Sequence, residues 1–195
     1  MRNSFNGRIP GLQPGDVGSI PITRSIMENK KVIFLDVDGV LNYTLWYIDD
    51  RNPGNLNGQE GDLDPLCIER INKLCEETGA EIVLSSDWRI NNGAFARLER
   101  AGLHKILDKT PITIFGTYGS TYHFTRGEEI QMWLEWHPEV TNYVILDDRT
   151  DFMEEQLPHF VYVNSYRGLT EEDYQLALNI LSRCPNGKEA VYKTD

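Results

Sequence analysis

Four short apolar runs, separated by helical patterns, constrain the fold of this chain most strongly. VIFL lies in a predicted strand at residues 31–36, and similar runs lie at 81–85, 143–146 and 160–163. Uniformly apolar strands are typical of parallel sheets that are buried on both faces. Strands that alternate with helices indicate crossover connections between parallel strands. The sequence therefore predicts an α/β fold: a Rossmann-like three-layer sandwich with a mostly parallel central sheet.

Helix signals occupy the segments between these strands. Asp64-Pro65 is an N-cap residue followed by proline at the first helical position, and Gly79 ends the apolar stripe that follows. Thr170 caps a last helix, which extends to about Ser182. Shorter helices are predicted at residues 92–101, 127–136 and 151–157, and a further strand is predicted at 111–115.

The composition limits the partners of the protein. The 195 residues favour one domain, and their net charge of -11 gives a surface field that repels phosphate backbones. We therefore expect no constitutive nucleic-acid binding, although a local basic patch could still hold a nucleic-acid substrate. No apolar run reaches the roughly 18–20 residues of a membrane span, so no membrane partner is expected. Cys67, Cys75 and Cys184 lack metal-ligand spacing, and free thiols of this kind fit a reducing, cytoplasmic location.

Residues 1–29 differ in composition from the rest of the chain. The first 26 residues are rich in Gly, Pro, Ser and Arg without a clean period, which predicts a disordered or non-native extension. Gly18-Ser19-Ile20-Pro21 is what GGTTCGATTCC, typical of the T-arm of a tRNA gene, encodes in one frame. Translated upstream DNA, with the true start at Met27, is therefore one hypothesis. A native extension or a mitochondrial presequence is the alternative.

Acidic residues follow two of the predicted strands. Asp36 and Asp38 come at the end of the first strand, and Asp147 and Asp148 follow the run YVIL. Because ligands of such sheets bind at the carboxyl ends of the strands, these side chains are expected to converge. Two carboxylates about 4 Å apart repel each other by roughly 1–4 kcal/mol, so the cluster requires a cation. Oxygen ligands favour a hard divalent ion, and Mg²⁺ fits best.

The spacing of the first acidic pair suggests catalytic roles. Asp36, at the edge of the sheet, is placed to attack as a nucleophile and form an aspartyl-phosphate. Asp38 reaches the same side, where it can protonate a leaving oxygen and later take a proton from water. Gly39 lets the backbone turn sharply beside the phosphate.

DVDGVLN resembles the first motif, DxDGxL, of the haloacid dehalogenase (HAD) superfamily, and VILDDRTD resembles the acidic fourth motif. EIVLSS is similar to the second motif, with Ser86 as the phosphate-binding hydroxyl and Ser85 as the alternative. Arg126 matches the place of the third-motif cation, and Lys109 is the alternative. Asp151 is either a metal ligand, in a DxxxD variant of the fourth motif, or a helix N-cap.

The resemblance implies a Mg²⁺-dependent phosphohydrolase domain over residues 30–195 that acts on phosphomonoesters through an aspartyl-phosphate. Its metal-side residues would be Asp36, Asp38, Asp147 and Asp148. Superfamily members that cleave carbon–halogen bonds usually lack the second aspartate, so Asp38 favours phosphoryl transfer. SSDWR and DDRTD are most similar to the polynucleotide-phosphatase and RNA-repair-like branch. A phosphotransferase with the same intermediate and a non-catalytic binding module are the other readings.

The insert at residues 42–63 is too short for a large cap domain, so we expect a minimal cap and an open site. Nucleotides, nucleic-acid ends and other phosphomonoesters are the candidate substrates. Trp46 and Tyr47 in this insert either pack or stack on a base. Trp88 is predicted to pack, and Arg89 either binds substrate or forms a structural ion pair.

Overall fold

Strand β1 (Lys30–Leu35) lies in the middle of a five-stranded parallel sheet. The computed structural model describes residues 29–53, 62–112, 114–117 and 120–183. The strand order is β3-β2-β1-β6-β7. The other strands are β2 (Glu81–Leu84), β3 (Ile106–Lys109), β6 (Val140–Asp147) and β7 (Phe160–Tyr162). The predicted α/β fold with a parallel central sheet is therefore confirmed.

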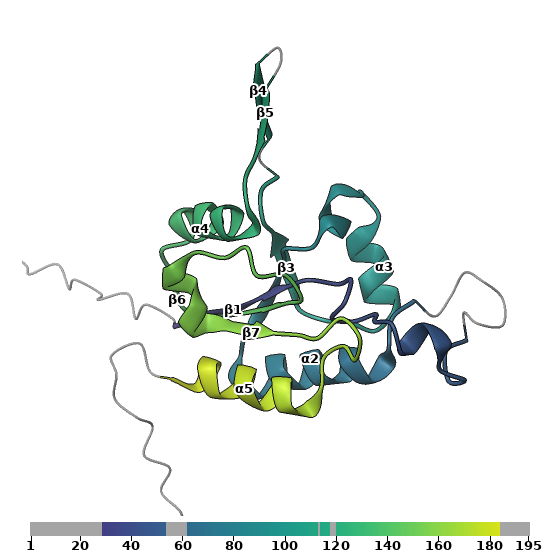
Figure 1. The fold of residues 1–195 in the computed structure, drawn as a ribbon. Coiled ribbons are helices and arrows are strands. Elements are labelled where there is room, and N and C mark those ends of the chain that lie inside the picture. The colour runs from purple at the N-terminus through teal and green to yellow at the C-terminus, as the bar shows by residue number, and fades with distance from the viewer. Residues whose placement is uncertain (1–28, 54–61, 113, 118–119, 184–195) are drawn as a thin grey trace, which may run out of the picture.

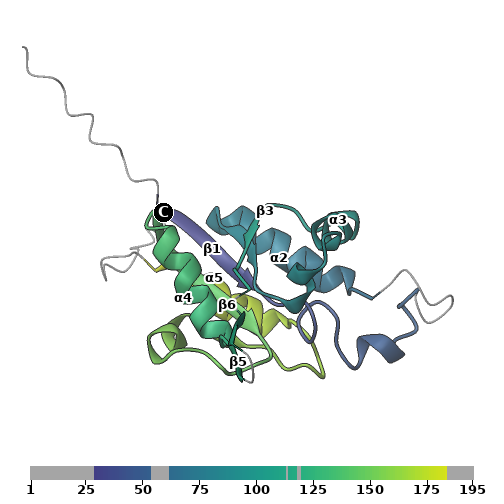
Figure 2. The same cartoon turned by 90° about the horizontal axis from the view of Figure 1, so that it is seen from above.

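Helices cover both faces of this sheet (Figures 1 and 2). Ile33 and Leu35 of β1 face a core that includes α2 (Pro65–Thr78), α3 (Ala94–Arg100) and α5 (Glu171–Ser182). Val32 and Phe34 point to the opposite face, where they pack with residues of α4 (Arg126–Trp136). Successive side chains of a strand alternate between faces, so one uniformly apolar strand serves both cores. This arrangement gives the three layers of the sandwich.

The helix boundaries follow the signals in the sequence. Oδ1 of Asp64 accepts a hydrogen bond from the Leu66 amide at 2.9 Å and so caps α2. Gly79 ends that helix with φ of 72°, a left-handed conformation that glycine adopts without a Cβ clash. The Thr170 side chain and Asp173 form a capping box at the start of α5.

Two predicted elements differ from the structure. The edge strand of the sheet is β3, whereas the prediction at 111–115 overlaps β4 (Ile114–Thr117), which pairs antiparallel with β5 (Ser120–His123) in a separate hairpin. Figure 1 shows this hairpin projecting from the body of the domain. β3 escaped prediction because it has one sheet neighbour and its residues alternate between half-buried and exposed, so its sequence ILDK carries no apolar run.

The helix predicted at 151–157 is instead η3, a 3₁₀ helix at Glu154–His159. Asp151 does not cap it, because the Asp151 carboxylate accepts hydrogen bonds from the Arg126 amide and the Arg149 side chain. Pro158 near its end has no N–H for a continuing helix.

The insert after β1 contains the 3₁₀ turn η1 (Trp46–Ile48), and η2 (Asp87–Ile90) follows β2. Trp46 is buried in the core, which agrees with packing. The proposed N-terminal extension, apart from residue 29, and Cys184 lie outside the described residues. Within the described part, no helix is both long enough and apolar enough to cross a membrane.

Candidate active site

The register of the central strands brings the predicted acidic residues together. Leu35 of β1 lies opposite Leu146 of β6, so the next residues, Asp36 and Asp147, are neighbours at the carboxyl edge of the sheet. Oxygen atoms of Asp36, Asp147 and Asp148 all lie within 4.8 Å of one another. We call these three residues the acidic cluster. Two of them, Asp36 and Asp147, are buried.

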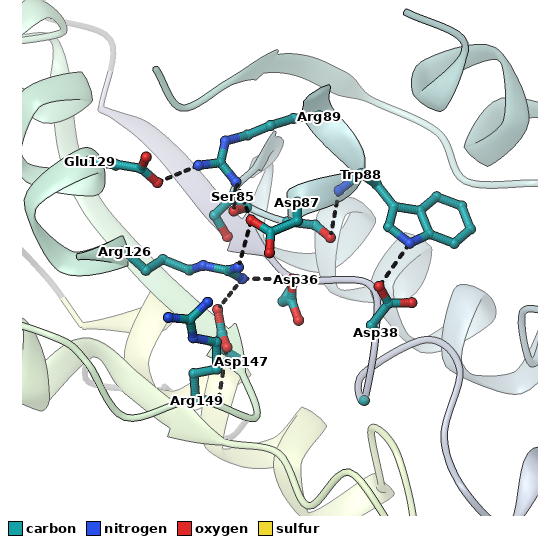
Figure 3. A network of polar contacts seen from close by, with 12 residues as sticks. Asp36, Asp38, Ser85, Asp87, Trp88, Arg89, Arg126, Glu129, Asp147 and Arg149 are labelled. Atoms are coloured by element: carbon teal, nitrogen blue, oxygen red, sulfur yellow. Dashed lines mark hydrogen bonds and ion pairs between the residues drawn. The ribbon is translucent and has the colours of Figure 1, made fainter. Parts of the chain in front are cut away.

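Arg126 supplies a positive charge in direct contact with this cluster. Its Nη1 atom donates to Asp36 Oδ1 at 2.6 Å and to Asp147 Oδ2 at 2.8 Å (Figure 3). The side chain is only 4% exposed, and the residue begins α4. Asp151 fixes the same position, because its Oδ2 accepts from the Arg126 amide at 3.2 Å. The capping turn of α4 therefore places a buried guanidinium between two strand ends.

The electrostatics leave a surplus of negative charge. Burial raises the pKa of Asp36, against the opposing effect of Arg126. Burial, with the charge of Asp36, raises the pKa of Asp147 to about 6, and burial also raises the pKa of Asp148. Burial disfavours the charge on Arg126, but the two carboxylates outweigh it and raise its pKa. Arg126 contacts Asp36 and Asp147, and Arg126 and Arg149 both oppose the rise in the pKa of Asp148, but Arg149 is also paired with Asp151. A further cation would therefore stabilise the ionised forms of the three carboxylates.

The donor set of the acidic cluster fits Mg²⁺. All three ligands are carboxylates, which are hard oxygen donors. Mg²⁺ holds oxygens at about 2.0–2.1 Å, so two ligands of one ion lie at most roughly 4.2 Å apart. The oxygens of the acidic cluster lie within 4.8 Å of one another, so small side-chain shifts would let them share one ion. Asp38 and Asp151 are not members of this group among the described residues. A metal-binding role for Asp38 remains a prediction.

Asp38 is held at both carboxylate oxygens. Oδ2 accepts from Nε1 of Trp88 at 2.9 Å, and Oδ1 accepts from Nδ2 of Asn42 at 2.7 Å. Oδ1 of Asn42 in turn accepts from the Gly39 amide at 2.9 Å. These bonds orient Asp38 beside the pocket that contains Asp36.

That pocket is open and has a volume of about 520 Å³. Its lining includes the predicted residues Asp36, Asp38, Ser86, Arg126 and Asp148. We call it the catalytic pocket. Five of the six residues predicted for the site therefore face one cavity, and the sixth, Asp147, lies directly behind Arg126.

The alternatives for the second and third motifs occupy different surroundings. Ser86 lines the catalytic pocket, and its hydroxyl hydrogen-bonds Asp36. Ser85 Oγ is buried without a partner in the described structure. Lys109 donates to the Arg89 carbonyl at 2.9 Å. This geometry favours Ser86 over Ser85 and Arg126 over Lys109.

Arg89 has a structural environment. It is buried, pairs with Glu129 of α4, and donates from Nη1 to the Ser85 carbonyl at 2.6 Å. The ion pair therefore ties the loop after β2 to the helix that carries Arg126. Asp87, in contrast, is mostly exposed and lies 3.5 Å from Nη2 of Arg126.

Three contributors to the site were not assigned from the sequence. Trp88 packs against the core as predicted, and in addition its indole N–H donates to Asp38. Arg149 and Ser165 line the catalytic pocket, and Ser165 hydrogen-bonds Asp148. Ser165 follows β7, so the rule that strand ends converge, applied to the last strand, would have found it.

A parallel sheet with an aspartate cluster and a buried arginine at its carboxyl edge defines a Rossmann-like protein of the haloacid dehalogenase type. The family model described as the HAD domain in Swiss Army Knife RNA repair proteins matches residues 32–174, and the chain belongs to this family. The resemblance to the HAD superfamily and its RNA-repair-like branch is thereby confirmed. The family supports a phosphohydrolase type of function in general. A search of curated proteins gave no match.

Proposed function

We propose that this protein is a Mg²⁺-dependent phosphomonoesterase that acts through an aspartyl-phosphate on Asp36. The observation that carries the proposal is the acidic cluster with Arg126 at the floor of an open pocket. Its surplus negative charge suits a metal ion, and the metal ion with Arg126 suits a phosphoryl group. The cluster would hold Mg²⁺, which supplies charge neutralisation for the nucleophile and the phosphoryl oxygens.

Asp36 and Asp38 divide the chemistry between them. Arg126 holds Oδ1 of Asp36, and we assign attack on phosphorus to Oδ2. As the new O–P bond forms, the bond to the leaving oxygen breaks, and Asp38 gives that oxygen a proton. Water then attacks the aspartyl-phosphate while Asp38 takes its proton, which releases phosphate and restores Asp36.

The other pocket residues bind the group in transfer. Ser86 and Arg126 would donate to the phosphoryl oxygens, because both line the catalytic pocket beside Asp36. Gly39 has φ of 85°, and a Cβ there would lie 2.4 Å from Asp148 Oδ2. Only glycine therefore lets the first-motif turn approach the acidic cluster this closely.

Phosphorylated nucleotides and nucleic-acid ends are the proposed substrates, in keeping with the RNA repair proteins of the matched family. The open pocket would admit the end of a long chain. A cytoplasmic location is proposed from the buried, unpaired thiols of Cys67 and Cys75.

A phosphatase panel tests the proposal. It contains p-nitrophenyl phosphate, nucleotides, sugar phosphates and oligonucleotides phosphorylated at the 3′ or 5′ end, each with Mg²⁺ or with EDTA. We expect phosphate release that needs Mg²⁺ and is abolished in Asp36→Asn, with circular dichroism showing that the variant is folded. Equal release by the wild type and Asp36→Asn would overturn the proposal.

A further inference from the structure

A second pocket of about 450 Å³ adjoins the catalytic pocket. The two share Asp38, Asn42 and Tyr47, but Asp36 lines only the catalytic pocket. Figure 3 shows Asp38 and Trp88 on the side of the site away from Arg126 and Asp147. The second pocket therefore extends from the catalytic pocket past the residue assigned as proton donor.

This position identifies the part of the substrate that the second pocket would receive. A phosphomonoester bound at Asp36 must place its leaving oxygen within reach of Asp38. The leaving group then continues beyond Asp38, into the second pocket. A third cavity of about 300 Å³ shares Asp87, Arg126 and Arg149 with the catalytic pocket, but Asp38 does not line it. The third cavity therefore adjoins the catalytic pocket away from Asp38, where the leaving group could not receive its proton.

Two arginines, Arg97 and Arg100, line the second pocket. The Arg97 guanidinium lies over the Trp88 ring, 4.3 Å from its centroid, and pairs with Asp62. Arg100 also lines the pocket and makes no hydrogen bond or ion pair with the described residues. Asp62 and Asp38 supply the opposing negative charges, but Asp62 is already matched by Arg97. A phosphate that approaches Arg100 would therefore contact a guanidinium that has no ion-pair partner among the described residues.

Two aromatic side chains stand beside these arginines. Tyr47 is 48% exposed and lines both pockets, and Trp88 lines the second pocket. The exposed Tyr47 ring offers a stacking surface for a base, which contributes about 1–3 kcal/mol per base in single-strand binding. Trp88 is half-buried, packs against the core and has Arg97 over its ring, so it forms part of the pocket wall. Burial and the charges of Asp38 and Asp62 raise the pKa of Tyr47, so its hydroxyl stays protonated as a hydrogen-bond donor.

We propose that the second pocket binds the terminal nucleotide of an oligonucleotide, with Tyr47 stacking on the base, Trp88 forming the pocket wall and Arg100 binding the next phosphate. This inference rests on the proposed phosphatase activity and adds a subsite that selects an oligonucleotide end over a mononucleotide. A simple phosphate ester or a mononucleotide lacks the second phosphate and would leave Arg100 unused. The contact is local, so it is compatible with the net charge of -11, which opposes tight binding of long nucleic acids.

The first test compares substrates and variants by kcat/KM. The substrates are p-nitrophenyl phosphate, nucleoside monophosphates, and dinucleotides carrying a 3′- or a 5′-terminal phosphate, in RNA and DNA forms. We expect a phosphorylated dinucleotide to be preferred over its mononucleotide by about 10-fold, the effect of one good ionic contact. Arg100→Gln should lower the ratio of dinucleotide to p-nitrophenyl phosphate activity by a similar factor, and Arg97→Gln should lower it less, because Arg97 is paired with Asp62.

Arg167→Gln is the matched control. It removes the same charge, and Arg167 is exposed and lines neither pocket. The control should leave the ratio unchanged. The inference would be overturned if the wild type had a ratio of dinucleotide to p-nitrophenyl phosphate activity as low as that of the pocket variants. It would also be overturned if neither pocket substitution changed this ratio. The comparison of RNA with DNA and of the two ends then defines which oligonucleotide end is accepted.

A binding measurement separates the inference from the proposed reaction. Titration calorimetry follows the same phosphorylated dinucleotides binding to Asp36→Asn, with and without Arg100→Gln, so no turnover is needed. We expect the Arg100 substitution to weaken binding about 10-fold. Unchanged binding would overturn the proposed role of the second pocket, even if the protein is an active phosphatase. If Arg100→Gln weakens binding but the wild type shows no Asp36-dependent turnover, the binding role of the second pocket is supported and the proposed phosphatase activity is contradicted.

Discussion

Replacing Arg126 with methionine keeps much of the side-chain volume but removes the charge shared by Asp36 and Asp147. The two Nη1–Oδ distances are 2.6 and 2.8 Å, so each pair has a Coulomb attraction of about 6 kcal/mol at an effective dielectric constant of about 20. Burial of the charged groups offsets most of this attraction. Removing one partner of a buried pair nevertheless costs about 3–5 kcal/mol, because the remaining charges are left uncompensated. We expect a loss of that size in the free energy of unfolding near pH 7.5 without Mg²⁺.

Urea unfolding in EDTA, near pH 7.5 and again near pH 5, measures this loss. It should shrink at the lower pH, because burial raises the pKa of Asp147 to about 6 and protonation removes the unpaired charge. Arg97→Met is the matched control, since Arg97 and Asp62 are 48% and 42% exposed and such a pair contributes about 1 kcal/mol or less. A loss for Arg126→Met no larger than that of the control, and equal at both pH values, would refute the reasoning.

Three further predictions concern the metal, the turn and the phosphate site. Burial raises the pKa of all three carboxylates in the acidic cluster, one of them to about 6. These three groups therefore bind more protons in the folded protein than in the unfolded chain between about pH 4 and 6, and their contribution to the stability of the metal-free protein falls as pH rises through this window. Thermal unfolding with Mg²⁺ and with EDTA should accordingly show a larger Mg²⁺ stabilisation near pH 7.5 than near pH 5; an equal shift at both would contradict this. Gly39→Ala should weaken Mg²⁺ binding by at least about 10-fold in titration calorimetry, because the new Cβ meets a cluster carboxylate. Gly79→Ala, at φ of 72° with nothing within 4 Å, should lose only the roughly 1–2 kcal/mol of backbone strain and keep its Mg²⁺ affinity. Ser86→Ala should lower kcat about 100-fold, the effect of losing one donor to a transferring group, whereas Ser85→Ala should change neither kcat nor stability appreciably, because its hydroxyl has no partner among the described groups. A larger loss of kcat in Ser85→Ala than in Ser86→Ala would assign the second motif to Ser85.

The central sheet and the acidic cluster were predictable because they follow from short-range patterns and topology. The run VIFL is buried on both faces, as its uniform apolar character requires. Once the strands are parallel, the register that pairs Leu35 with Leu146 necessarily brings Asp36 beside Asp147. The strand pattern and the parallel topology therefore account for the meeting of Asp36 and Asp147 in the acidic cluster.

The remaining features depend on contacts between distant segments. Nothing in SSDWR indicates that the Trp88 indole turns back to bind Asp38, which lies 50 residues earlier in the chain. The edge strand β3 has one neighbour, so its burial is partial and its pattern weak. Asp151 pairs with Arg149 and accepts from the Arg126 amide, and it is not a member of the acidic cluster. Each of these outcomes is decided by tertiary packing and not by local propensity.

The most direct measurement of the central claim is the detection of phosphate on Asp36. Asp38→Asn slows hydrolysis of the intermediate, because Asp38 is the group assigned to activate water. After acid quenching of this variant with an activated phosphomonoester and Mg²⁺, mass spectrometry should find one phosphate on the peptide containing Asp36. EDTA present during the reaction should prevent the modification, because it removes the Mg²⁺ that the proposed reaction needs. Hydroxylamine added afterwards should remove the modification, because it cleaves an acyl phosphate. Phosphate release without that adduct, or an adduct on another residue, would contradict the account.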